Sequence, residues 1–146
     1  MVDPITVPLE VDINEDAAPE GDARDWRRPL FSVEHVGETL VVMPNIRGNM
    51  FRYAQLQTEA NALRQKLAQR SMGGLVLDLQ ELDYLGAEVI GAVVALARKM
   101  EDGGGRAVFC CAAPQLAEAL TKMGLHRLWA LFPTREAALA AVQSQN

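Results

Sequence analysis

The stretch "VLDLQELDYLGAEVIGAVVALA", from Val76 to Ala97, decides the fold. It follows directly on Leu75, and the run "LVLDL" (75–79) is short and mostly apolar, as expected for a central strand that is covered on both sides. The second half of the stretch is apolar nearly all round and contains small residues, which predicts a closely packed, buried helix. The loop between them holds a single carboxylate, Glu88, at the helix start. A buried strand that passes through a loop into a helix is the building unit of an α/β sheet.

The rest of the chain repeats this alternation on either side. Alternating apolar residues predict strands, and apolar residues spaced three or four apart predict amphipathic helices. The predicted strands are 30–36, 39–44, 75–79, 106–112 and a short edge strand within 125–132, and the predicted helices begin near Tyr53, Val89, Pro114 and Arg135. The order β-β-α-β-α-β-α-β-α predicts an α/β fold with a mixed, mostly parallel five-stranded sheet and about four helices.

Local signals support the two helices nearest the C-terminus. Pro114 suits the first turn of a helix because its missing N–H is not needed there. Leu116, Leu120 and Met123 form the apolar stripe of that helix. Thr134 is predicted to cap the last helix.

Charge divides the chain into two parts. Residues 1–28 carry eight of the 19 acidic residues and three of the 14 basic ones, which accounts for the whole net charge of −5. We interpret residues 1–28 as a flexible acidic N-terminal segment and residues 29–146 as a single folded domain. A neutral domain with an acidic segment argues against nucleic-acid binding, which requires a clustered basic patch.

Several bulk features indicate a cytoplasmic protein. No apolar run reaches the roughly 18 residues needed to span a membrane, and the N-terminus has neither the basic start nor the apolar core of a secretory signal. Cys110 and Cys111 are neighbours in a predicted strand, so their side chains should point to opposite faces and should pack in the core without a disulfide between them. This cysteine content fits a reducing compartment.

No catalytic or metal-binding arrangement stands out. His35 and His126 belong to no cluster with ligand spacing, and no serine lies in a nucleophile-elbow context. The glycines at 103–105 lack the Lys and Ser/Thr of a phosphate-binding loop and precede a strand, so they indicate a turn. Asp78 could act as a base, but a hydrogen bond to local backbone is the favoured interpretation. The sequence therefore predicts a non-enzyme with no catalytic residues, no metal and no cofactor.

The run "GGLVLDLQELDYLGAEVIGAVVALARKMEDGGGRAVFCCAAPQLAEALTKMGLHRLWALFPTREAALAAV" resembles a STAS domain of the bacterial anti-sigma factor antagonist type. The resemblance covers residues from about 30 to 146. It is carried by "LVLDL" with its strand–loop–helix, the glycine-marked turn before "AVFCC", the segment "LTKMGLHRLWALFPTREAAL" and the order of the elements. It implies a STAS-like fold.

That family usually carries an Asp-Ser-Ser-Gly-like motif in the loop after this strand. The second serine is phosphorylated by a cognate anti-sigma factor that is also a serine kinase, and phosphorylation breaks the complex between the two proteins. In this chain the matching positions are Gly86, Ala87, Glu88 and Val89. Glu88 therefore stands where the phosphorylated serine is expected, and the chain keeps the scaffold without the phosphoacceptor.

Two interpretations of Glu88 remain open. A glutamate carries about one negative charge against about 1.5 to 2 for a phosphoserine, so Glu88 could act as a permanent, partial mimic of the phosphorylated state. Alternatively, the site has drifted after regulation was lost, and an acidic residue in the first turn of a helix contributes only about 0.3–1 kcal/mol of stability.

The resemblance also implies a partner-binding face. In the resembled family the loop "NIRGN" (45–49), the loop around Glu88 and the exposed side of the next helix meet the partner. The residues carried over are Asn45, Arg47, Gly48, Asn49, Gly86, Ala87, Glu88 and Val89. The resemblance implies a bacterial signalling module that binds an anti-sigma factor or related signalling protein without a serine phosphorylation cycle. The alternatives are a stressosome-like scaffold and a cytoplasmic accessory subunit of a transport system, and a homodimer is a further candidate assembly.

Overall fold

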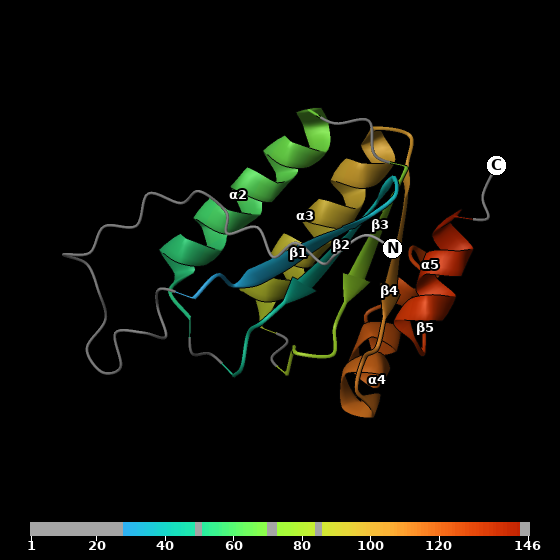
Figure 1. The fold of residues 1–146 in the computed structure, drawn as a ribbon. Coiled ribbons are helices and arrows are strands. Elements are labelled where there is room, and N and C mark those ends of the chain that lie inside the picture. Colours follow the sequence, from blue (N-terminus) through green and yellow to red (C-terminus); the bar gives the residue numbers. More distant parts are fainter. Residues whose placement is uncertain (1–27, 49–50, 70–72, 84–85, 144–146) are drawn as a thin grey trace.

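The computed structural model describes residues 28–48, 51–69, 73–83 and 86–143, and the predicted acidic segment therefore lies almost entirely outside them (Figure 1). The elements are β1 (Phe31–Val36), β2 (Thr39–Pro44), α2 (Tyr53–Gln69), β3 (Gly74–Asp78), α3 (Ala87–Asp102), β4 (Arg106–Cys110), α4 (Pro114–Lys122), the 3₁₀ helix η2 (Leu125–Arg127), β5 (Leu131–Phe132) and α5 (Arg135–Gln143). The predicted order of strands and α-helices is confirmed. None of the described helices has the length and apolarity required to cross a bilayer.

The sheet has the strand order β1-β2-β3-β4-β5. β1 and β2 form an antiparallel hairpin, and every later pairing is parallel, so the predicted mixed, mostly parallel sheet is confirmed. The hairpin turn contains Gly37 with a positive φ of 60°, a backbone conformation that glycine adopts without steric cost. Because parallel strands all point the same way, the loops that leave β2, β3 and β4 meet at one edge of the sheet (Figure 1).

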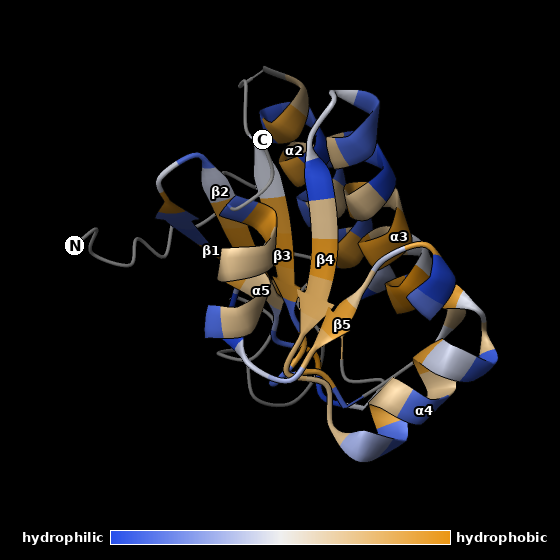
Figure 2. Cartoon of the chain, turned by 90° about the vertical axis from the view of Figure 1, so that its right-hand side faces the viewer, coloured by the Kyte–Doolittle hydropathy of each residue, from blue (hydrophilic) through white to orange (hydrophobic). Residues whose placement is uncertain are grey.

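Helices cover both faces of the sheet, and alternate strand residues supply the two cores. Leu40, Leu75 and Ala107 belong to the larger core, which includes residues of α2 and α3. Their neighbours Val41 and Val76 belong to the smaller core beneath α5. β3 and β4 are hydrophobic along most of their length, as a strand buried on both faces must be (Figure 2).

The segment before α5 differs from the prediction. The edge strand expected within 125–132 shrinks to β5, because the chain first forms η2 after Gly124 turns into the left-handed region with φ 76°. This detour buries Trp129 against Phe109, with ring centroids 5.9 Å apart. Met123, which we predicted on the buried stripe of α4, is 46% exposed because the helix has already ended at that residue.

β4 also ends earlier than predicted. The strand stops at Cys110, and Cys111 takes a positive φ of 63°, which breaks the extended alternation. The two cysteine side chains were predicted to point to opposite faces, and this prediction is wrong: their Sγ atoms lie 3.4 Å apart. The prediction that Thr134 caps the last helix is confirmed, since its Oγ1 accepts a hydrogen bond from the N–H of Ala137 at 3.1 Å.

The close approach of α5 to the start of β3 leads to a first prediction. A Cβ at Gly74 would overlap Cγ1 of Val142, whose β-branched side chain has little freedom to move. Gly74→Ala should therefore lower the free energy of unfolding by about 1–3 kcal/mol. Urea denaturation measures this, with Gly91→Ala as the control: a Cβ at Gly91 meets open space, so that helix substitution should be neutral or stabilising by up to about 1 kcal/mol. Equal effects of the two substitutions would contradict the prediction.

Candidate functional site

The candidate site lies where the loop after β3 passes into α3. Gly86 is the N-cap of α3, with an extended backbone (φ −69°, ψ 157°), and its carbonyl accepts hydrogen bonds from the N–H groups of Val89 and Ile90, both at 3.1 Å. The Val89 side chain is fully buried and anchors this first turn in the core. The backbone that positions Ala87 and Glu88 is therefore held by a cap on one side and a core residue on the other.

Glu88 occupies the first turn of α3 and is exposed. Within the described part of the chain, its carboxylate forms no hydrogen bond or ion pair. The unpaired N–H groups at a helix N-terminus favour negative charge, and they would favour a phosphate for the same reason. The geometry thus presents a negative charge to solvent at a place that suits an anion.

The loop after β2 is tied to the loop after β3. The N–H of Gly48 donates to Oδ1 of Asp83 at 2.5 Å, and the N–H of Asp83 donates to the carbonyl of Ile46 at 3.3 Å. Arg47 forms an ion pair with Glu81 at the surface. An exposed ion pair contributes little stability, so the Arg47–Glu81 pair adds only a small part to the bonds that Asp83 makes with Gly48 and Ile46.

Two other predicted site residues, Asn45 and Val89, have a supporting role in the structure. The side-chain Nδ2 of Asn45 donates to Oγ of Ser32 at 2.7 Å, and the backbone N–H of Asn45 donates to the carbonyl of Leu30. Asn45 therefore supports the loop, and Val89 supports the helix start from within the core. Asn49 lies outside the described residues.

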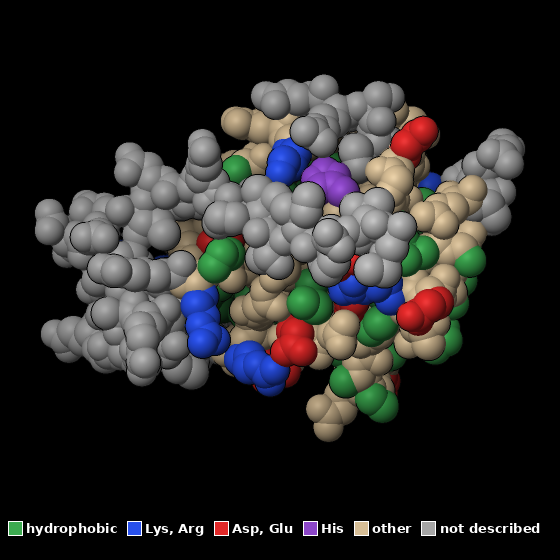
Figure 3. Space-filling view, in the orientation of Figure 1, with side chains coloured by type: hydrophobic (Ala, Val, Ile, Leu, Met, Phe, Trp, Pro, Cys, Tyr) green, Lys and Arg blue, Asp and Glu red, His purple; other side chains and the backbone are tan. Residues whose placement is uncertain are grey.

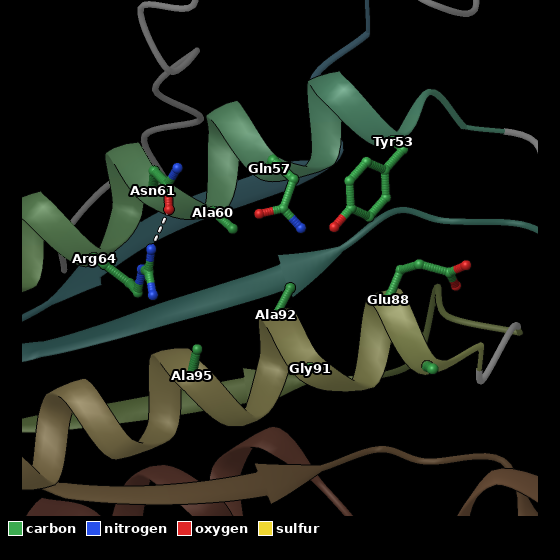
Figure 4. Close-up of a pocket in the computed structure, with 10 residues that line it drawn as sticks. Tyr53, Gln57, Ala60, Asn61, Arg64, Glu88, Gly91, Ala92 and Ala95 are labelled. Carbon is green, nitrogen blue, oxygen red and sulfur yellow. Dashed lines mark hydrogen bonds between the residues drawn. The ribbon is translucent and has the colours of Figure 1, made fainter.

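A groove of about 240 Å³ runs between α2 and α3 beside the helix start (Figure 4). Tyr53 on α2 and Glu88 on α3 face each other across one end of it, and Arg64 lies at the other end, hydrogen-bonded to Asn61. Tyr53 is 59% exposed, so its ring is accessible at the surface. The floor and the α3 wall are lined by small residues: Ala60, Gly91, Ala92 and Ala95.

A partly buried ionic network lies at the C-terminal end of β3. Asp78 is fully buried, and its carboxylate accepts the N–H and the side-chain amide of Gln80, at 3.1 and 2.9 Å. The predicted hydrogen bond to local backbone is thus confirmed. Oδ2 of Asp78 also accepts a hydrogen bond from Nε of Arg135 at 2.9 Å and forms an ion pair with its Nη2 at 2.9 Å. Nη1 of Arg135 donates to Glu34 at 2.9 Å. One guanidinium thus joins β1, β3 and α5.

Two thiols adjoin this network. Cys110, Cys111 and Asp78 offer ligand atoms within 4.8 Å of one another. The Asp78 carboxylate is already paired with Arg135, whose positive charge opposes a cation at this position. Burial raises the pKa of both thiols, so they are neutral near neutral pH.

Sequence reasoning missed three contributors to the site: Tyr53, Glu81 and Asp83. The two acidic residues lie in the loop between β3 and α3, and their charge is complementary to that of Arg47. This complementarity is the sequence signal that could have predicted a contact between the two loops. On the described part of the face shown in Figure 3, positively and negatively charged side chains lie next to each other. This part of the face therefore has no extended patch of purely positive or purely negative charge.

The comparisons with known proteins agree with this architecture. The family model for the STAS domain matches residues 32–138. No curated protein sequence matches the chain. Among solved structures, an anti-sigma factor antagonist from Mycobacterium paratuberculosis is 24% identical, with a TM-score of 0.64, and the match covers 77% of this chain and 92% of that one.

Two further structures are similar in fold. A serine-to-glutamate variant of RsbS from Moorella thermoacetica is 21% identical, with a TM-score of 0.67 and coverage of 78% of this chain and 95% of that one. The phosphorylated form of SpoIIAA, a cell fate determinant of Bacillus, is 19% identical, with a TM-score of 0.61 and coverage of 77% and 98%. The family model matches well over half of the chain, and its fold is the one observed: the chain belongs to the STAS domain family.

Proposed function

We propose that this protein is a non-enzymatic signalling module that binds a serine-kinase anti-sigma factor, or a related signalling protein, without a phosphorylation cycle. In this proposal Glu88 supplies a fixed negative charge where related domains present a phosphorylatable serine. The observation that carries the proposal is the position of Glu88: it is exposed, unpaired among the described residues and held at the N-terminus of α3.

The surrounding geometry supports a docking face at this edge of the sheet. Arg47 and Ala87 are exposed, and the bond between Gly48 and Asp83 keeps the two loops in a fixed relation. A link of this kind between two loops lowers the conformational entropy that they lose when they bind a partner. The exposed groove wall formed by Tyr53 extends this face toward α2.

The experiment is a binding titration against kinase-type anti-sigma factors from the same genome, with and without ATP. It compares the wild type with Glu88→Ser, Glu88→Ala and Glu101→Ser. Glu101 is exposed near the other end of α3, so Glu101→Ser makes the same change in charge away from the proposed face.

If Glu88 is a permanent mimic, Glu88→Ser binds at least tenfold tighter, which corresponds to about 1.4 kcal/mol, and becomes phosphorylated. Glu88→Ala then also binds more tightly but takes no phosphate, and Glu101→Ser behaves as the wild type. If wild type and Glu88→Ser bind equally well, the module binds its partner but Glu88 is not a mimic.

If no variant binds any such kinase, the anti-sigma proposal fails. Co-purification with a membrane transporter would then favour the transport-subunit alternative. Assembly into large particles with other STAS proteins would favour the scaffold alternative.

A further inference from the structure

The two cysteines at the end of β4 are held together by an unusual backbone conformation. Adjacent residues in a strand direct their side chains to opposite faces, but Cys111 has a φ of 63°, and its Sγ lies 3.4 Å from that of Cys110. A positive φ is uncommon for a residue with a Cβ, and such residues occur preferentially at functional positions. The N–H of Cys111 donates to the carbonyl of Phe132 at 3.0 Å, which ties this conformation to β5.

The surroundings favour one kind of chemistry for these thiols. Cys110 is fully buried, and Asp78 already carries a buried negative charge nearby that is paired with Arg135. A lasting negative charge on the fully buried Cys110, as a thiolate or a sulfinate, would be costly in such a place. Joining the two neutral thiols in a disulfide leaves the charge of the site unchanged.

We propose that Cys110 and Cys111 are a redox-responsive dithiol that closes reversibly to an intramolecular disulfide when the protein meets a hydroperoxide. Cys111 is the more accessible of the two and is the thiol that meets the oxidant. Cys110 is the resolving thiol, held within reach by the geometry.

One molecule of hydrogen peroxide oxidises both thiols in two steps. The half-buried Cys111 first loses its proton, in a minor fraction of molecules that grows as pH rises. Its thiolate attacks one peroxide oxygen, the O–O bond breaks, and the departing hydroxide takes up that proton to become water. The sulfur of Cys110 then attacks the sulfenic sulfur of Cys111, the S–O bond breaks, and a second water leaves with the proton of Cys110. Both thiols are oxidised, and one peroxide is reduced to two waters.

Formation of the disulfide would affect the backbone that leads to the candidate site. The carbonyl of Cys110 accepts the N–H of Leu79 at 2.9 Å, and Leu79 begins the loop that leads to Glu88. Reshaping the backbone at the cysteines therefore strains the first residue of that loop. The proposal itself does not depend on the identity of the binding partner.

The test treats the folded, full-length protein with hydrogen peroxide at mildly alkaline pH, then blocks free thiols under denaturing conditions and digests with trypsin. Cleavage after Arg106 and Lys122 leaves both cysteines in one peptide, residues 107–122. We expect this peptide to lose the mass of two hydrogen atoms and to accept no blocking group. Dithiothreitol should restore both free thiols.

The control is Cys111→Ser, which keeps the volume and removes one sulfur at the more accessible position. It should show no such mass loss and no dithiothreitol-reversible loss of its remaining thiol within the monomer. The proposal is overturned if wild-type peptide gains oxygen atoms instead, if disulfides form only between chains, or if both thiols stay free under conditions that fully oxidise dithiothreitol.

Discussion

Replacing Arg135 with Met should lower the free energy of unfolding by about 3–5 kcal/mol, the largest loss that we expect from any single substitution on the polar network. Arg135 donates one hydrogen bond to the fully buried Asp78, with which it also forms an ion pair, and one hydrogen bond to Glu34. Methionine fills a similar volume but leaves the buried carboxylate without its counter-charge, which is the costly way to break such a pair. Gln80 continues to donate two hydrogen bonds but supplies no charge.

Urea denaturation of wild type, Arg135→Met, Asp78→Asn and the double variant measures the effect and its coupling. If the loss comes from an unpaired charge, the double variant is less destabilised than the sum of the single variants. Arg127→Met, in the exposed part of η2, is the matched control and should change stability by less than about 0.5 kcal/mol. A loss below about 1 kcal/mol for Arg135→Met, or simple additivity, would contradict this account.

The second large effect is expected at Glu59. This α2 residue is 1% exposed, and its Oε1 accepts the backbone N–H groups of Leu30 and Phe31 at 2.8 and 3.2 Å, while Oε2 accepts Nε2 of Gln55 at 2.8 Å. It therefore attaches the start of β1 to α2. Glu59→Leu leaves two buried N–H groups without an acceptor, at about 1–3 kcal/mol each. Removing the buried carboxylate also removes its own desolvation cost, which offsets part of this sum, so we expect a net loss of about 2–4 kcal/mol in urea denaturation. Glu118→Leu, at an exposed position of α4, should be near neutral.

Glu59 also predicts a pH dependence with a definite sign. Burial raises its pKa above the ordinary value of 4.5 despite hydrogen bonds that act in the opposite direction. The folded state then binds more protons than the unfolded state. The stability that Glu59 gains from this proton binding is complete below the ordinary pKa and is lost as pH rises through the folded pKa.

Glu59→Gln keeps an acceptor for the two N–H groups and does not titrate, so it isolates this contribution. The unfolding free energy of Glu59→Gln minus that of the wild type should increase as pH rises above the ordinary pKa of 4.5. A difference that is constant with pH, or that decreases, would show that the carboxyl pKa is not raised.

The fold followed from patterns that are local in sequence. Apolar spacing located α2 through Leu56, Leu63 and their neighbours, and the apolar run around Val76 identified the central strand. The prediction failed where one residue's backbone conformation changed the course of the chain. Gly124 and Cys111 both have left-handed backbone conformations. Gly124 replaces the start of the strand predicted within 125–132 with a turn, and Cys111 ends the strand predicted at 106–112.

The candidate site was predictable only in part. The resemblance placed Glu88 at the position of the phosphoserine, and the structure puts it on the surface at a helix start. The link between the loops through Gly48 and Asp83 joins residues 35 apart in the chain, and no local pattern reports such a contact. The same is true of Arg135, whose partner Asp78 is 57 residues away.

The sequence by itself determined the element order, the mostly parallel sheet and the glutamate at the start of α3, because apolar periodicity and single residue identities are local properties. Only the tertiary structure decided which polar groups meet: Arg135 with Asp78 and Glu34, Glu59 with the start of β1, and Cys110 with Cys111. The physical reason is that a buried polar group must find a partner, and the partner is whichever group the packing of the sheet and helices brings within hydrogen-bond distance.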